Sequence, residues 1–173
     1  CGLLLLGHLL FSFLGEALEK SKKARDYHYL YDVACAGQLH LDPPTDLHVT
    51  HHAMTTAIEE RRFLDAQRLL EDCAGRIAAD LASDADLQAS LLERRGWLAT
   101  TWCEYAEEQG DRQSARRLRE QAIALYQDCR ELLVQSEARF PLQKRLIKKR
   151  LGRCYTNLGY HLNRLGQFEE AFW

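Results

Sequence analysis

Apolar side chains recur along this chain at intervals of three and four residues, the spacing of one face of an α-helix. Breaks in this pattern coincide with Pro, Gly, Asp and Ser. The pattern predicts about eight helices, over residues 3–14, 16–39, 46–61, 63–82, 84–109, 112–139, 141–165 and from 168 onward. Short turns between helices favour antiparallel hairpins stacked in series. We place the hairpins at about 2–41, 46–82, 84–139 and 141–173.

Four breaks fix the expected helix ends. Asp42-Pro43-Pro44 ends the second helix, because proline cannot continue a helix and disfavours it at the preceding residue. Thr45 or Asp46 is then the expected N-cap of the third. Gly110-Asp111 and Gly166 predict turns, and Phe140-Pro141 predicts a break before a helix that tolerates proline in its first turn.

Composition agrees with an all-α fold. The 173 residues include only 3 Pro and 10 Gly, and Val and Ile are scarce, which leaves little from which to build a sheet. An apolar content of 46% and a charged content of 28% are typical of a globular protein. Because no low-complexity linker interrupts the chain, we predict a single domain over residues 1–173. The formal charge of −2 favours neither a polyanionic nor a polycationic partner.

The six cysteines are spread singly, with no C-x-x-C pair. We interpret them as small buried residues in a reducing compartment, and therefore expect a cytoplasmic protein without disulfides. The apolar segment Leu3–Leu14 is too short to span a bilayer, which takes about 20 such residues. We expect it to be a core helix, and we expect no membrane partner.

A repeat is visible at the C-terminus. Tyr155 is followed by Leu158-Gly159, Leu162, Gly166, Phe168 and Ala171. The twelve-residue interval from Gly159 to Ala171 returns between Cys103 and Ala115 and between Met54 and Ala66. Small side chains at these positions would let the two helices of a hairpin cross closely.

This pattern resembles the tetratricopeptide repeat (TPR) over about residues 46–173. The fold that the resemblance implies is a right-handed α-solenoid of antiparallel helix hairpins. Ala66 and Ala115 are 49 residues apart, and Ala115 and Ala171 are 56 apart, against 34 in the standard repeat. Such long, degenerate repeats are similar to those of NB-ARC/STAND-type signalling ATPases and large bacterial regulators. Two other positions depart from the family pattern: Arg119 replaces a large apolar residue and Met54 replaces a small one.

A terminal repeat normally presents a polar outer face, whereas the chain ends with Phe172 and Trp173. We therefore expect that it is a piece of a longer protein, and that the remainder of its own chain is one partner. The nucleotide-binding module of the signalling ATPases would lie in that remainder, because no G-x-x-x-x-G-K-[ST] motif occurs here.

The resemblance implies a protein-interaction, sensor or scaffold segment that binds a peptide or protein on the concave face formed by the first helices. On the third helix the matching positions are His48, His51 and Thr55. The candidate partner-binding residues on the later helices are Trp97, Thr100, Glu104, Glu108, Arg153, Thr156, Tyr160, Asn163 and Arg164. Trp97 and Tyr160 are the strongest candidates, since aromatic residues anchor interfaces.

Other clusters suggest alternatives. A basic run, formed by Lys144, Arg145, Lys148, Lys149, Arg150 and Arg153, suggests a segment that contacts nucleic acid. Acidic residues of the preceding repeat offer a different role for this run, as attraction between neighbouring repeats; they are Glu104, Glu107 and Glu108.

His48, His51 and His52 suggest a metal-dependent enzyme, but no carboxylate or cysteine completes the set in sequence. Cys154 and His161 lack a catalytic context. We therefore predict no catalytic activity, no metal and no cofactor, and we favour a protein partner over nucleic acid.

Overall fold

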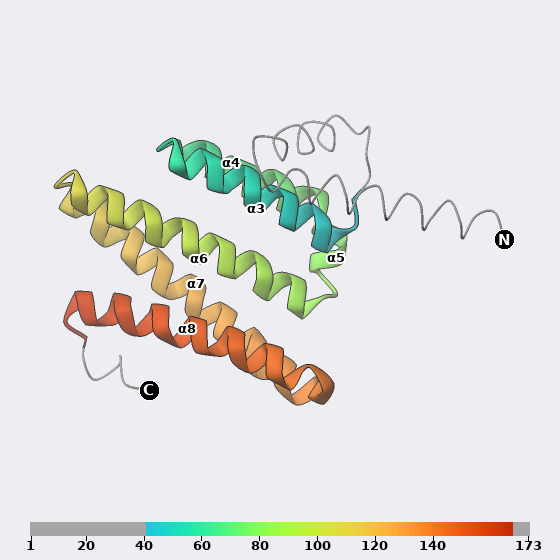
Figure 1. Ribbon diagram of the computed structural model, residues 1–173. Helices are drawn as coiled ribbons and strands as arrows, with labels where there is room; N and C mark the ends of the chain where they lie inside the picture. The colour runs from blue at the N-terminus through green and yellow to red at the C-terminus, as the bar shows by residue number, and fades with distance from the viewer. Residues whose placement is uncertain (1–40, 168–173) are drawn as a thin grey trace. The chain divides into compact units, whose positions relative to one another are not determined.

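The computed structural model describes residues 41–167 of the chain (Figure 1). The chain forms two compact units, Cys1–Leu41 and Asp42–Trp173, and the described residues fall almost entirely in the second. They form six α-helices and one short 3-10 helix, η1. The elements are α3 (Pro43–Glu59), α4 (Phe63–Arg76), α5 (Ala78–Leu81), α6 (Ala85–Glu108), α7 (Arg112–Arg139), η1 (Pro141–Gln143) and α8 (Lys144–Leu165).

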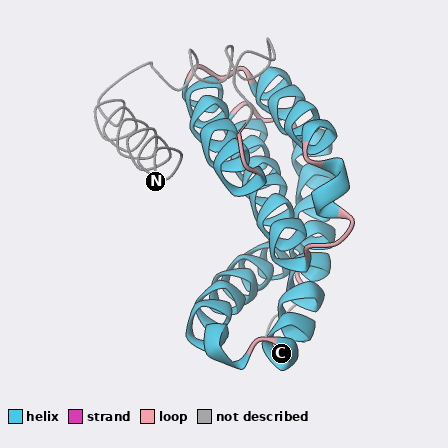
Figure 2. Cartoon of the chain, turned by 90° about the vertical axis from the view of Figure 1, so that its right-hand side faces the viewer, coloured by secondary structure: helices cyan, strands magenta, loops and turns pink. Residues whose placement is uncertain are grey.

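The predicted all-α class is confirmed for residues 41–167, which contain no strand (Figure 2). Six helices are fewer than the eight expected. The helices predicted over 3–14, over 16–39 and from 168 onward lie outside the described residues. The single domain and the right-handed solenoid stay predictions.

Several helix ends follow from local capping. The side chain of Asp84 accepts hydrogen bonds from the backbone N–H groups of Asp86 and Leu87, which begins α6. Asp111 accepts from Ser114 N–H at 3.0 Å and begins α7. Gly110 and Gly166 have φ angles of 75° and 78°, a left-handed conformation that glycine adopts without steric cost. The predicted turns at these two glycines and the break at Phe140-Pro141 are confirmed.

Three predicted boundaries are wrong. The seventh helix was expected from residue 141, but Pro141 lies in η1 and α8 begins at Lys144. The third helix begins at Pro43 rather than after the prolines, because Asp42 is the N-cap and both prolines occupy the first turn. A first-turn proline costs little, since that N–H has no partner within the helix. The fourth helix was predicted to run to Ala82 but stops at Arg76. The break at Ile77 carries that side chain into the core and leaves α5 as a separate turn.

The helices lie in two layers. Figure 1 shows α3, α6 and α8 in one layer, with α4 and α7 behind them. α3 pairs with α4, α6 with α7, and α7 with α8, while α3 and α4 also contact α6. One core cluster joins α3, α4 and α6 around Met54 and Leu70, and a second joins α6, α7 and α8 around Leu133 and Ile147.

The twelve-residue spacing can be checked at the middle hairpin. The Sγ of Cys103 donates a hydrogen bond to the carbonyl oxygen of Ala115 at 3.2 Å, so these positions meet where α6 and α7 pack. Met54 and Ala66 are both fully buried in the first core cluster. Ala171 lies outside the described residues, so its pairing with Gly159 stays a prediction.

Gly96 on α6 is required by packing. A Cβ added there would lie 2.9 Å from the ring of Tyr126, which is itself buried. We expect Gly96→Ala to lower the free energy of unfolding by about 1–2 kcal/mol, because overpacking outweighs the higher helix propensity of alanine. Thermal and urea unfolding followed by circular dichroism will measure the change.

Gly152, on the exposed side of α8, is the matched control, since an added Cβ there has no neighbour within 4 Å. Gly152→Ala should raise the free energy of unfolding by about 0.5–1 kcal/mol. Equal effects of the two substitutions would show that Gly96 does not set the distance between α6 and α7.

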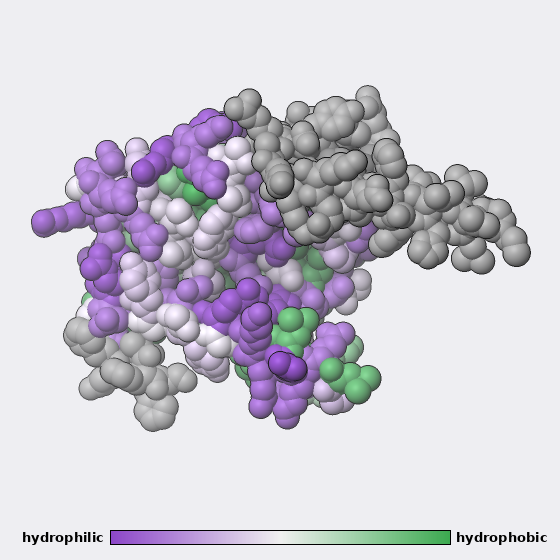
Figure 3. All heavy atoms as spheres, viewed as in Figure 1, coloured by the Kyte–Doolittle hydropathy of each residue, from purple (hydrophilic) through white to green (hydrophobic). Residues whose placement is uncertain are grey.

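Side chains on the face shown in Figure 3 are mostly hydrophilic. Hydrophobic residues gather at the end where α7 meets α8, and Phe140, Leu142 and Leu146 are exposed in that segment. Among the described helices, none combines the length and hydropathy needed to cross a membrane.

Candidate functional site

A cleft of about 450 Å³ opens between the helices of the front layer. His51 and Thr55 come from α3, and Arg153 and Asn157 come from α8. α6 supplies the centre, with Glu93, Arg94 and Trp97, while Tyr126 of α7 and Cys154 of α8 complete the lining. Three helices that are neighbours in the front layer, α3, α6 and α8, therefore share one cleft.

Aromatic rings form one part of the lining. The ring centroids of His51 and Trp97 are 5.2 Å apart. Burial, followed by the nearby charge of Arg94, lowers the pKa of His51 to about 4, so this imidazole is neutral at neutral pH. Burial also raises the pKa of Tyr126 to about 12 and keeps its hydroxyl protonated. These neutral rings offer a surface for apolar or aromatic groups of a ligand.

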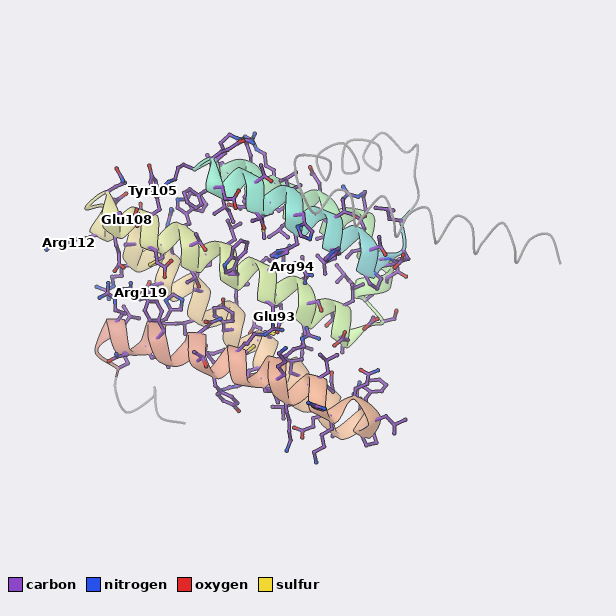
Figure 4. All side chains as sticks on the ribbon, in the orientation of Figure 1. Glu93, Arg94, Tyr105, Glu108, Arg112 and Arg119 are labelled. Atoms are coloured by element: carbon purple, nitrogen blue, oxygen red, sulfur yellow. The ribbon has the colours of Figure 1, made fainter. Side chains whose placement is uncertain are left out.

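Arg94 brings a positive charge into the cleft. Its Nη1 donates to the carbonyl oxygen of Ser90 at 2.9 Å, whereas its buried Nε has no hydrogen-bond partner. Burial lowers the pKa of Arg94, the nearby Glu93 carboxylate acts in the opposite direction, and the cations Arg150 and Arg153 lower the pKa further. Figure 4 shows Arg94 on the side of α6 that faces α3 and Glu93 on the side that faces α8. Arg94 therefore keeps one hydrogen-bond donor without a partner, its Nε, which suits a further anionic acceptor.

On the other side of α6, charged residues hold α8 in place. Arg150 of α8 is buried, and its Nε contacts both carboxylate oxygens of Glu93 at 3.2 Å. Its two Nη atoms donate to Asp86 and to the Ser90 hydroxyl. Arg153 lies 3.7 Å from Glu93. Around the cleft, the guanidinium groups of Arg94, Arg150 and Arg153 thus outnumber the carboxylates of Glu93 and Asp86.

A second set of charges joins α6, α7 and α8 beyond the cleft. Arg119 is buried, and its Nη2 lies 2.6 Å from Glu107. Glu107 also pairs with Arg164 at 2.9 Å. Burial raises the pKa of Glu107, but hydrogen bonds from the two arginines outweigh burial and lower it. Arg119, which departs from the family pattern, is therefore paired within the helix stack.

Two of the nine predicted partner-binding residues, Trp97 and Arg153, line the cleft. The structure does not bring the other seven into it. Thr100 is half-buried and lies 2.8 Å from His161 Nε2, Glu108 pairs with Arg61, and Arg164 pairs with Glu107. The remaining four are exposed on α6 and α8: Glu104, Thr156, Tyr160 and Asn163. Of the matching positions on α3, His51 and Thr55 line the cleft, as described above, and His48 is exposed.

Sequence reasoning missed five lining residues: Glu93, Arg94, Tyr126, Cys154 and Asn157. Arg94 and Asn157 continue the chosen helix faces by one turn, since they lie three residues before Trp97 and four after Arg153. Extending the predicted face would have found both. Tyr126 belongs to a second helix of a hairpin, and no local pattern places its ring in the cleft.

The basic run on α8 does not form one continuous surface. Arg150 is buried in its ion pairs, and Lys144 lies 3.7 Å from Glu137. Arg145, Lys148 and Lys149 are exposed. The basic run does pair with acidic residues of α6 at Arg150, but the partners are Asp86 and Glu93 rather than Glu104, Glu107 or Glu108. The nucleic-acid alternative stays a prediction.

The histidine and cysteine candidates from the sequence have the following neighbours in the structure. The T-shaped contact of His48 and His52 has ring centroids 4.7 Å apart, while His51 packs on Trp97. Cys154 lies against Cys129 rather than His161, with 3.5 Å between the two Sγ atoms. The four described cysteines, at positions 73, 103, 129 and 154, are buried free thiols, which confirms their predicted burial.

The cleft therefore combines a neutral aromatic surface with a surplus of guanidinium groups, which suits binding of an anionic ligand. Comparisons of the chain with protein-family models, curated proteins and solved structures found no match.

Proposed function

We propose that the described helices are TPR-like hairpins of a right-handed solenoid, and that they bind a peptide segment of a partner protein in the cleft between α3, α6 and α8. One observation supports this proposal: α3, α6 and α8, which would be the first helices of the three proposed hairpins, line a single cleft. Concave surfaces made in this way are how helical-repeat proteins present extended binding sites. The segment would act as an interaction or scaffold part of a larger regulatory protein.

The charges favour an acidic peptide. Arg94 places a buried Nε without a hydrogen-bond partner beside the cleft, and Arg153 adds a second guanidinium at its edge. A carboxylate of the ligand would accept hydrogen bonds from such groups and offset the repulsion among the arginines. Trp97 and His51 would contact an aromatic or aliphatic side chain next to that carboxylate.

A displayed library of random peptides, selected on the full 173-residue chain, tests the proposal. We expect enrichment of sequences in which Asp or Glu lies within a few residues of an aromatic or large aliphatic residue. Fluorescence anisotropy with one enriched, labelled peptide then gives its Kd. Failure to enrich any sequence family, or enrichment of basic peptides, would contradict the proposal.

Arg94 and Arg95 provide a matched pair of variants. Both lie on α6, but Arg95 lines a different hollow, with Gln67 and Gln121 among its neighbours. Arg94→Gln should raise the Kd about 10- to 100-fold, the usual loss for a charged hydrogen bond. Arg95→Gln removes the same charge and should change the Kd by no more than about twofold. Equal losses would indicate general electrostatic attraction instead of binding in the cleft.

A further inference from the structure

Three potential metal ligands meet where α6, α7 and α8 pack. Glu93 of α6, Cys129 of α7 and Cys154 of α8 each bring one ligand atom within 4.8 Å of the other two. Both cysteines are fully buried, and Glu93 is half-buried. Among the described residues, this is the cluster of three His, Cys, Asp or Glu side chains that is close enough to hold one ion.

The distance between the two sulfur atoms suits a shared metal. In a tetrahedral zinc site with Zn–S bonds of about 2.3 Å, the two sulfurs lie roughly 3.8 Å apart. Here the Sγ atoms of Cys129 and Cys154 are 3.5 Å apart, so a movement of a few tenths of an ångström is enough. A disulfide would instead require the sulfurs to approach to about 2.0 Å.

Charges around the cluster support a bound cation. Two thiolates and the Glu93 carboxylate carry three negative charges, so a divalent ion leaves one, which faces the guanidinium of Arg150. Arg150 already contacts both oxygens of Glu93 and orients that carboxylate. Such hydrogen-bonded partners of ligands are a regular part of metal sites. The cost is two hydrogen bonds, because Cys129 donates its thiol proton to the carbonyl oxygen of Ala89 at 3.4 Å and Cys154 donates its own to the Sγ of Cys129 at 3.5 Å.

We propose that Glu93, Cys129 and Cys154 bind one thiophilic divalent cation, with zinc as the preferred ion. Each cysteine loses its proton to solvent and forms a metal–sulfur bond, so one ion releases two protons. Glu93 supplies the third ligand. Because Glu93 and Cys154 also line the cleft, the fourth coordination position faces it and is open to water or to a ligand group.

No local pattern in the sequence indicated this site, and we therefore expected no metal. Its ligands come from three helices, and 36 residues separate Glu93 from Cys129. The proposal does not depend on peptide binding, and its test uses metal ions alone.

Cobalt(II) titration of the reduced, metal-free 173-residue chain tests the site. One equivalent of Co²⁺ should produce a thiolate-to-metal charge-transfer band in the ultraviolet and intense visible bands of four-coordinate cobalt. Zn²⁺ should then displace the cobalt, so that the charge-transfer band and the visible bands disappear. A thiol assay under denaturing conditions should count six thiols per chain, which confirms that Cys129 and Cys154 enter the titration reduced. Absence of the charge-transfer band in folded, reduced protein would overturn the proposal.

Variants assign the ligands. Cys129→Ser and Cys154→Ser should each abolish the charge-transfer band of the paired thiolates or weaken Zn²⁺ binding by more than about 100-fold, since loss of a mere hydrogen-bonding partner costs roughly 10- to 100-fold. Glu93→Gln should keep the charge-transfer band and weaken Zn²⁺ binding. Cys103→Ser changes a buried cysteine outside the cluster. This variant should bind Zn²⁺ with the affinity of the unaltered chain and keep the charge-transfer band. Cobalt binding that survives in the cysteine variants without a thiolate band would place the metal on the histidines of α3 and overturn the assignment. If a serine variant does not fold, the unaltered chain still decides the question through its spectrum and stoichiometry.

Discussion

Replacing Arg150 by methionine is expected to lower the free energy of unfolding by about 3 kcal/mol, because the largely buried carboxylate of Glu93 loses its buried partner and keeps only the longer contact to the exposed Arg153. The Arg150 side chain is only 6% exposed and joins α8 to Asp86, Ser90 and Glu93 of α6. Methionine keeps much of the side-chain length, so the loss reports mainly on charge and hydrogen bonds. Urea unfolding followed by far-ultraviolet circular dichroism, in buffer with a metal chelator, measures it.

Lys149→Met is the control for this experiment. Lys149 is the preceding residue on α8 and is exposed, so its replacement should change the free energy of unfolding by no more than about 0.5 kcal/mol. Adding Glu93→Gln to Arg150→Met should restore part of the lost stability, since the carboxylate that has lost its buried partner is then removed. Similar losses for Arg150→Met and Lys149→Met would contradict a structural role for the buried arginine.

Acidification from pH 7 to pH 5 is expected to lower the free energy of unfolding by about 2 kcal/mol through His161 alone. The ring of His161 is fully buried, and its Nε2 lies 2.8 Å from the Thr100 hydroxyl. Burial, with a further contribution from Arg119, lowers the pKa of His161 to about 4, although Glu107 acts in the opposite direction. The folded protein therefore holds this imidazole neutral.

The sign follows from which state takes up the proton first. The histidine of the unfolded chain titrates near 6.5 and the folded one near 4, so the unfolded state binds more protons between these values. The stability contribution is fully present above about pH 6.5 and is lost progressively as the pH falls from about 6.5 to about 4. His51, whose pKa is lowered to about 4 chiefly by burial, adds to the loss in the same direction.

His161→Gln isolates this contribution. The variant should show a shallower dependence of unfolding free energy on pH between 7 and 5 than the unaltered chain does. His48→Gln, at an exposed histidine of α3, should leave the contribution of His161 in place. Urea unfolding at several pH values measures both slopes. An unchanged slope in His161→Gln would mean that the buried ring is protonated in the folded state as readily as in the unfolded state.

Much of the helix pattern was predictable because its causes are local. The α7 bounds, Arg112–Arg139, match the prediction, since Gly110-Asp111 before it and Phe140-Pro141 after it act within one helical turn. The meeting of Cys103 and Ala115 was also predictable, because both flank the same short turn. The lining of the cleft was harder to predict from the sequence. Trp97 and Arg153 follow from helix faces, whereas Tyr126 reaches the cleft only because Gly96 leaves room for its ring.

By itself, the amino-acid sequence determined the all-α character of residues 41–167, most helix ends and the pairing of neighbouring helices across short turns. These features depend on side-chain periodicity and on capping or turn residues within a few positions of one another. Only the tertiary structure decided that Arg150 is buried against Asp86 and Glu93 and that Cys129 meets Cys154. The partners in these contacts are 25 to 64 residues apart in the chain. Their distance depends on how whole helices pack, which no local spacing specifies.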